Sequence, residues 1–260
     1  MEDVTVCGLS FRILRRRSDF FKAVAGDLPV SSTGLVLWEC GLLLAEYLGY
    51  ACFTEVPEGV RGWWQLHEPA PVVPTRCLEW KSEWCSGAAR FWRSQLPVLE
   101  LGGGAGLVCA ALASLGASVV YTDLDLAALR TAEQNCLEAE RRQRRQQRRR
   151  QRQRQRWEDK WPGRRAGGVG PRWGSCAFRT LAFGDVGAAE QVVRELGPFG
   201  HVVGSDLLYG EKAPPGPLLD TLETLRAAQE EPFLVTLAIK NRCCNEVGVW
   251  MCNRMSTWPP

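Results

Sequence analysis

The stretch "PVLELGGGAGLVCAALASLGASVVYTDLD", residues 97–125, contains two apolar runs, a cluster of glycines and a final pair of acids. The first run, "PVLEL", predicts a buried strand, and "GLVCAALASLG" predicts a helix that ends at Gly116. The second run, "SVVYTD", predicts another strand, which ends at Asp123. A strand, a glycine loop, a helix and a second strand in this order are typical of the start of a parallel α/β sheet.

Strands and helices continue to alternate after Asp123. The sequence predicts helices over 126–140, 188–196 and 217–228, and strands over 176–183, 201–209 and 232–240. This alternation predicts a doubly wound, mostly parallel sheet with helices on both faces. Upstream, residues 4–14 alternate loosely as a hairpin does, and residues 33–48 have the pattern of a buried helix.

The glycine loop lies where an open parallel sheet binds its ligand, at the carboxyl end of a strand. Glycines let the backbone turn sharply and approach a ligand without an intervening side chain. Asp123 ends the next strand, where an acid can accept both hydroxyls of a ribose. The dinucleotide fingerprint G-x-G-x-x-G would need a glycine at Leu107, whereas the observed pattern is E-x-G-x-G-x-G from Glu100 to Gly106. A glycine-rich turn that binds nothing is the alternative interpretation.

Composition excludes several classes of protein. The chain has 260 residues, of which 45% are hydrophobic, enough for one sizeable core. It has no apolar run of about 18 residues that would span a membrane. We therefore expect a protein without membrane contact in the cytoplasm, with the nucleus as a further location. The eleven cysteines form no C-x-x-C pair and there are only two histidines, so we expect reduced thiols and no metal site.

The positive charge is concentrated in one segment. "RRQRRQQRRRQRQRQR", residues 141–156, has ten arginines and no acid; without it, the net charge of +3 becomes −7. The preceding predicted helix could continue into this tract. Clustered arginines bind RNA or act as a nuclear address. A solvated extension is favoured, because the tract has no apolar face and no aromatic residue for base stacking.

Composition also divides the chain. The expected segments are an N-terminal hairpin and helix (1–50), a Trp/Pro-rich insertion (51–96), the cofactor-binding half of the α/β domain (97–140), an Arg/Gln-rich insertion (141–172), the rest of that domain (173–240) and an irregular tail (241–260).

Three further stretches flank the glycine loop: "GLVLWECGLLLAEYL" upstream, "LAFGD" after the third predicted strand of the domain and "GSDLLYGE" after the fourth. Together with "VLELGGGAGLV", they resemble the eukaryotic family-16 (methyltransferase-21-like) seven-β-strand protein-lysine methyltransferases. That family typically has a V-W-[DE] helix, an E-L-G-x-G-x-G loop, a T-D acid, an L-x-W-G turn and a D-x-x-Y motif. The resemblance covers roughly residues 33–48, 98–136 and 178–239.

The resemblance implies a Rossmann-like class I methyltransferase with S-adenosyl-L-methionine as its cofactor. The residues that would bind the cofactor are Trp38, Glu100, Gly102, Gly103, Gly104, Gly106, Asp123, Phe183 and Ser205. Phe183 replaces the family's tryptophan, which keeps a ring face for the adenine but loses the indole N–H donor. Asp206 and Tyr209 match D-x-x-Y and would be the catalytic residues beside the target lysine.

The implied activity is methylation of a lysine side chain in a protein substrate, and a monomer is expected. The substrate classes that the family suggests are a chaperone, an AAA ATPase or a translation elongation factor. Nucleic acid is not favoured, because "SDLLY" lacks the [ND]-P-P-[YFW] motif of amino-directed base methyltransferases. The alternative function is a catalytically impaired Rossmann-like binding protein that acts through contacts, including contacts of the arginine tract with RNA.

The family fold continues past its fifth strand with a helix and an antiparallel hairpin. After Lys240 only "NRCCNEVGVWMCNRMSTWPP" follows, which is short for those elements. We therefore expect a sheet truncated at the C-terminal hairpin, with residues 232–240 as an exposed edge strand.

Overall fold

The computed structural model describes residues 2–6, 9–13, 39–50, 91–93, 95–160, 172–208, 214–241 and 246–252. The strands are β1 (Glu2–Val6), β2 (Leu9–Ile13), β3 (Val98–Leu101), β4 (Ser118–Asp123), β5 (Ser175–Thr180), β6 (His201–Ser205), β7 (Leu234–Asn241) and β8 (Glu246–Cys252). The helices are α3 (Glu39–Tyr50), α5 (Leu107–Ser114), α6 (Leu126–Lys160), α7 (Val186–Leu196) and α8 (Pro215–Ala227). None of the helices described has the length and apolar character needed to cross a bilayer.

One sheet organises the molecule, with the strand order β5-β4-β3-β6-β7-β8. The first five strands are parallel to one another, which confirms the predicted doubly wound α/β fold. From β3 the chain moves outward to β4 and β5 and then returns to β6 on the other side of β3. The strand order therefore reverses between β3 and β6, the place where such sheets bind ligands. The predicted N-terminal hairpin is a separate two-stranded sheet of β1 and β2.

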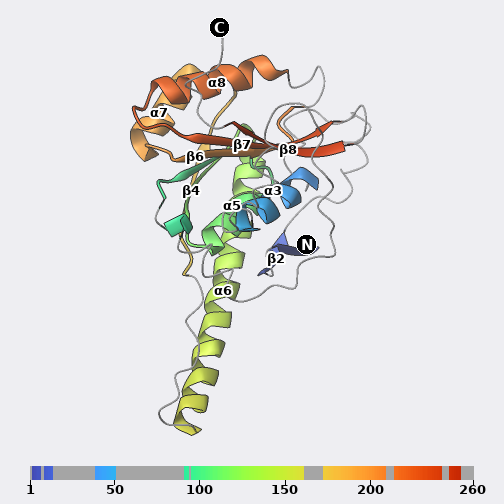
Figure 1. The fold of residues 1–260 in the computed structure, drawn as a ribbon, viewed down its shortest axis with the longest axis vertical. Coiled ribbons are helices and arrows are strands. Elements are labelled where there is room, and N and C mark those ends of the chain that lie inside the picture. Colours follow the sequence, from blue (N-terminus) through green and yellow to red (C-terminus); the bar gives the residue numbers. More distant parts are fainter. Residues whose placement is uncertain are drawn as a thin grey trace, which may run out of the picture.

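Helices cover the two faces of the sheet (Figure 1). The helices α7 and α8 lie on one face, where their buried residues pack with Leu99 and Val120. The helices α3, α5 and α6 lie on the other face and pack with Val98, Val119 and Tyr121. Successive residues of β3 and β4 thus face opposite cores, and all but Ser118 are buried.

The edge of the sheet differs from the expectation. Strand β8 pairs antiparallel with β7 along its whole length, from Val235 opposite Cys252 to Asn241 opposite Glu246. The expectation of an exposed edge at residues 232–240, and of an irregular tail over residues 246–252, was therefore wrong. The short segment "EVGVWMC" contains enough β-branched and aromatic residues to form the strand that β7 needs.

Helix α6 runs well beyond the body of the molecule (Figure 1). Its buried residues lie at helical spacing and stop at Ala139; they are Ala128, Leu129, Ala132, Asn135, Cys136 and Ala139. The arginine tract continues the same helix without a break as far as Lys160. Residues 161–171 of the expected Arg/Gln-rich insertion, and residues 51–90 of the Trp/Pro-rich insertion, lie outside the described residues.

Candidate active site

The glycine loop between β3 and α5 is held in a conformation that glycine permits. Gly102, Gly104 and Gly106 have φ values of 56°, 55° and 76°, in the left-handed region. A Cβ atom at Gly103 would collide with the Tyr121 ring and lie 2.8 Å from the Glu100 Cδ. The loop is therefore pressed tightly against β4, with no space for a side chain at its centre.

Hydrogen bonds fix this loop to the end of β4. The Gly103 amide donates to the Thr122 carbonyl at 3.0 Å, and the Gly104 amide donates to Asp123 Oδ2 at 3.0 Å. The Tyr121 hydroxyl donates to the Gly104 carbonyl at 2.6 Å. The predicted pair of glycine loop and strand-end acid is thus one connected unit, with Tyr121 as a support that the sequence analysis did not single out.

The carboxylate of Asp123 has the properties of a ribose acceptor. Its Oδ1 accepts from the Asp125 amide at 2.9 Å, and its Oδ2 accepts from the Gly104 amide at 3.0 Å and lies 3.4 Å from the Tyr121 hydroxyl. Because the single Tyr121 proton is directed at the closer Gly104 carbonyl, 2.6 Å away, each carboxylate oxygen can still accept from a hydroxyl donor. Burial raises the pKa of Asp123, while the two amide donors act in the opposite direction. A ligand with neighbouring hydroxyls would add donors to the charged form and thereby favour it.

Glu100 lies behind the loop. Its side chain is 2% exposed, and burial raises the pKa of Glu100 well above its usual range. One side of the carboxyl group lies beneath Gly103, and the backbone amide of Cys109 donates to it. The Oε2 atom is buried without a hydrogen-bond partner among the described residues. This arrangement gives Glu100 a supporting position between the loop and α5, and its contact with a cofactor stays a prediction.

The other predicted cofactor residues come from neighbouring strand ends. A Cβ atom at Gly102 would lie 3.6 Å from Phe183 Cζ and 2.7 Å from Leu207 Cδ2, so the residues after β5 and β6 meet beside the loop. Ser205 ends β6, and its Oγ lies 3.5 Å from the Cβ position of Gly41 in α3. The structure therefore brings Phe183 to the loop and Ser205 to the upstream helix. Leu207 is a contact that the sequence analysis missed.

Asp206 follows directly after β6 and is 9% exposed. Its φ of 52° is a left-handed conformation that a residue with a Cβ seldom adopts. The Asp206 amide donates to the Ala238 carbonyl of β7 at 2.9 Å, which holds this turn at the carboxyl end of the sheet. Such strained residues cluster at functional sites. The two remaining predicted residues, Trp38 and Tyr209, lie outside the described residues.

Comparisons with solved structures give distant similarities to methyltransferases. An rRNA methyltransferase, aviRa from Streptomyces viridochromogenes, is 19% identical with a TM-score of 0.38, over 68% of this chain and 79% of that one. The magnesium protoporphyrin IX methyltransferase of Synechocystis PCC 6803, solved with bound SAH, is 15% identical with a TM-score of 0.33, over 62% of this chain and 57% of that one. The chain thus spans less than two thirds of the second protein.

The comparison with curated proteins found no match. A family model described as lysine methyltransferase matches residues 26–163, which is more than half of the 260 residues and includes the glycine loop and Asp123. The chain therefore belongs to the lysine methyltransferase family, whose cofactor is S-adenosylmethionine.

Proposed function

We propose that this methyltransferase transfers a methyl group to a lysine side chain of a protein substrate. The observation that carries the proposal is the hydrogen-bonded unit of the glycine loop and Asp123, at the reversal of strand order, with Asp206 at the end of the adjacent strand. The name of the matched family supports lysine as the target.

In the proposed mechanism, the cofactor supplies an electrophilic methyl group when it is bound. Asp123 would accept hydrogen bonds from the ribose hydroxyls and so hold the ribose of the cofactor at the end of β4. Gly102 and Gly103 have no room for a side chain against Leu207 and Tyr121. The backbone of this loop would approach the cofactor at the end of β3. Alignment of the two reactants supplies most of the acceleration, so no nucleophile from this chain is needed.

Asp206 is proposed to orient the target amine. A lysine amine has a reference pKa of about 10.4 and must lose a proton before it can attack. Removal from water favours the neutral amine, whereas a nearby carboxylate favours the charged one. Asp206 would therefore act mainly as a hydrogen-bond acceptor that positions the amine, and Tyr209 would line the lysine channel. Family resemblance suggests a chaperone, an AAA ATPase or an elongation factor in the cytoplasm or nucleus as the substrate.

A second candidate is a binding function of the arginine-rich part of α6. Its ten arginines lie on a helix that extends past the body of the molecule (Figure 1). This charge would attract nucleic acid whether or not the candidate active site catalyses methyl transfer. Lysine methylation remains the stronger proposal, because the strand-end carboxylates have no use in such a role.

The test is methyl transfer from labelled S-adenosylmethionine to a cell extract, followed by mass spectrometry of the labelled molecule. We expect label on lysine of a protein, removed by protease and resistant to ribonuclease. The Asp206→Asn variant should lose transfer while S-adenosylhomocysteine still raises its melting temperature. Label on RNA, or full transfer by the Asp206→Asn variant, would contradict the proposal.

A further inference from the structure

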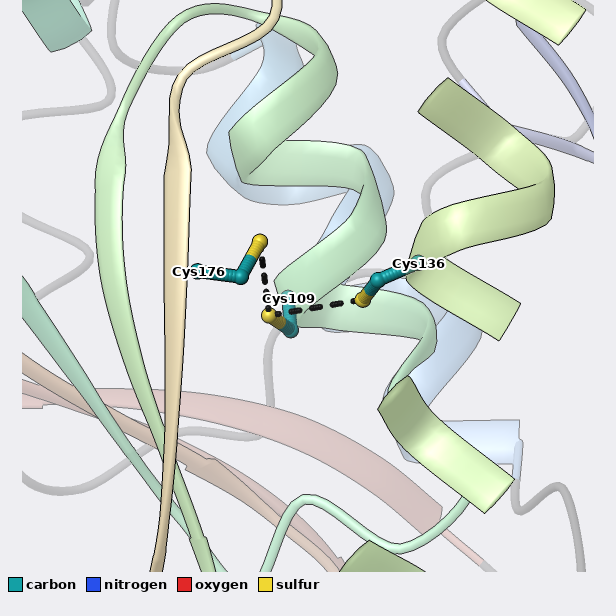
Figure 2. Close-up of side chains that lie close together, drawn as sticks. All are labelled: Cys109, Cys136 and Cys176. Atoms are coloured by element: carbon teal, nitrogen blue, oxygen red, sulfur yellow. Dashed lines mark hydrogen bonds between the residues drawn. The ribbon is translucent and has the colours of Figure 1, made fainter. Parts of the chain in front are cut away.

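Three cysteines from distant parts of the sequence meet behind the glycine loop. Cys109 comes from α5, Cys136 from α6 and Cys176 from β5 (Figure 2). The Cys109 Sγ lies 3.7 Å from the Sγ atoms of both Cys136 and Cys176. All three sulfur atoms lie within 4.8 Å of one another. At these distances the sulfurs are too far apart to be disulfides, which need about 2.05 Å.

The spacing of the sulfurs suits one shared metal ion. With a zinc–sulfur bond of about 2.3 Å, ligating sulfurs are about 3.8 Å apart in a tetrahedral site and about 4.0 Å apart in a trigonal one. The two measured separations of 3.7 Å need almost no adjustment, and the third pair lies within 4.8 Å. Sulfur ligands select soft or borderline ions such as Zn²⁺ and Cu⁺ over Mg²⁺ or Ca²⁺.

The surroundings offer access and a polar partner. A pocket of about 220 Å³ reaches Cys136 and Cys176 and is also lined by Glu133, Glu140 and Trp173. The side chain of Trp173 makes a hydrogen bond to Cys176, as groups around metal-bound sulfur commonly do. Glu133 adds negative charge at the pocket, whereas Glu140 is already paired with Arg144. The pocket leaves room for a fourth ligand, such as water.

We propose that Cys109, Cys136 and Cys176 bind one Zn²⁺ ion, with the fourth position facing this pocket. Zn²⁺ is favoured over Cu⁺ because three thiolates leave a net charge of −1 with Zn²⁺ and −2 with Cu⁺, and the smaller buried charge costs less. The bound ion joins α5, α6 and β5. Since the Cys109 amide also donates to Glu100, the ion steadies the base of the glycine loop. This explains how a chain without metal-ligand spacing in its sequence can still form a metal site.

The first experiment titrates the reduced, metal-free full chain with Co²⁺ as a spectroscopic probe and then with Zn²⁺. We expect thiolate-to-cobalt charge-transfer absorption that saturates at one equivalent and disappears when Zn²⁺ is added. Each of Cys109→Ser, Cys136→Ser and Cys176→Ser should lower the affinity by at least about tenfold. The matched control is Cys40→Ser, which changes a buried cysteine of α3 outside the cluster and should leave the absorption unchanged. Absorption that is absent from the full chain, or equally strong in all three cluster variants, would overturn the proposal.

A second measurement needs no substitution and therefore does not depend on the folding of the variants. Alkylation of the intact chain, followed by peptide mapping, gives the reaction rate of each cysteine with and without Zn²⁺. We expect Zn²⁺ to slow the modification of Cys136 and Cys176, which line the pocket, by at least about tenfold and a chelator to restore it. Unchanged rates at both positions would overturn the proposal. Neither experiment requires the cofactor or methyl transfer, so the outcome is independent of the proposed function.

Discussion

The two halves of α6 are helical for different physical reasons. Up to Glu140 the helix packs against the body, and Asn135 donates to the Ala105 carbonyl of the glycine loop at 2.8 Å. From 141 to 160, a segment that the structure describes completely, no residue is buried, although its first residues still contact the body: Gln143 donates to the Ser114 carbonyl at 2.8 Å and Arg142 lies 3.7 Å from Asp3. This distal half depends on the good helix propensity of Arg and Gln and on ion pairs such as Arg154–Glu158 at 2.7 Å. The proximal half is therefore tied to the glycine loop, and we expect the part of the distal half beyond Gln143 to tolerate change without affecting that loop.

The largest expected effect is the loss of cofactor binding in Asp123→Ala, at the end of β4 just before the proximal half. Two hydrogen bonds from ribose hydroxyls to a carboxylate are worth about 3–6 kcal/mol together, which corresponds to at least about a hundredfold in affinity. Isothermal titration with S-adenosylhomocysteine measures this loss. The control Asp220→Ala changes an exposed acid on α8 and should bind normally. Equal affinity of the Asp123→Ala variant and the control would show that Asp123 does not bind the cofactor.

The next effect concerns packing of the proximal half. A Cβ atom at Gly106 would lie 2.6 Å from the Cβ and 2.9 Å from the Cα of Ala132 in α6, at a φ of 76°. Overpacking and left-handed strain together predict that Gly106→Ala lowers the free energy of unfolding by about 2–4 kcal/mol. Gly216→Ala is the matched control, because nothing lies within 4 Å of its added Cβ. It should be neutral or stabilising by up to about 1 kcal/mol. Urea unfolding gives both values, and equal losses would show that the contact with α6 is unimportant.

Some features of the fold and of the candidate site could be predicted from the sequence. The glycine loop and Asp123 lie close together in the sequence. The parallel pairing of β3 with β4 then places Asp123 beside the loop in the structure. The loop and this acid depend on short stretches whose structure is fixed by local chemistry. Phe183 and Ser205 were named through the family resemblance; the structure places Phe183 beside Gly102 and Ser205 beside Gly41, and their roles stay predictions. The continuation of α6 into the arginine tract was only one possibility from the sequence, which also placed residues 141–172 in a separate insertion; the structure shows one helix from Leu126 to Lys160.

Features that depend on distant pairing were missed. Strand β8 was not predicted, because its seven residues become a strand only when β7 offers its edge. The cysteine cluster was missed as well, since Cys109 lies 27 residues from Cys136 and 67 from Cys176. Only the packing of α5 between α6 and β5 brings the three sulfurs together. The expectation of no metal site was based on the spacing of cysteines and histidines along the sequence. That spacing does not show which cysteines come together in the folded protein. The places of Trp38 and Tyr209 stay predictions.

A smaller effect concerns the pH dependence of stability and of cofactor affinity at Asp123. Burial raises the pKa of Asp123 in the native state above the ordinary value of 3.8. Between 3.8 and the raised value the native state binds more protons than the unfolded state, so the stability of the free protein falls as pH rises through this window. Cofactor affinity should rise over the same window, because the ribose donors favour the carboxylate. Urea unfolding of the wild type and Asp123→Asn, with and without S-adenosylhomocysteine, measures both slopes. A pH dependence of affinity that survives in Asp123→Asn would assign it to another group.

The smallest effect on the site is expected from the distal half. The triple variant Arg148→Gln, Arg149→Gln, Arg150→Gln changes three exposed residues to another good helix former. Its free energy of unfolding should stay within about 0.5 kcal/mol of the wild type, and its cofactor affinity within about threefold, because these residues lie far along the helix from the loop.

Binding of the same triple variant to single-stranded RNA should weaken. The slope of log affinity against log salt should become shallower by up to about 2, since each phosphate that an arginine neutralises adds about 0.7 to the slope. Titration calorimetry and fluorescence anisotropy across a salt series measure these quantities. A tenfold loss of cofactor affinity in the triple variant would show that the arginine-rich half contributes to the site, and the division of α6 into a packed half and an independent half would then be wrong.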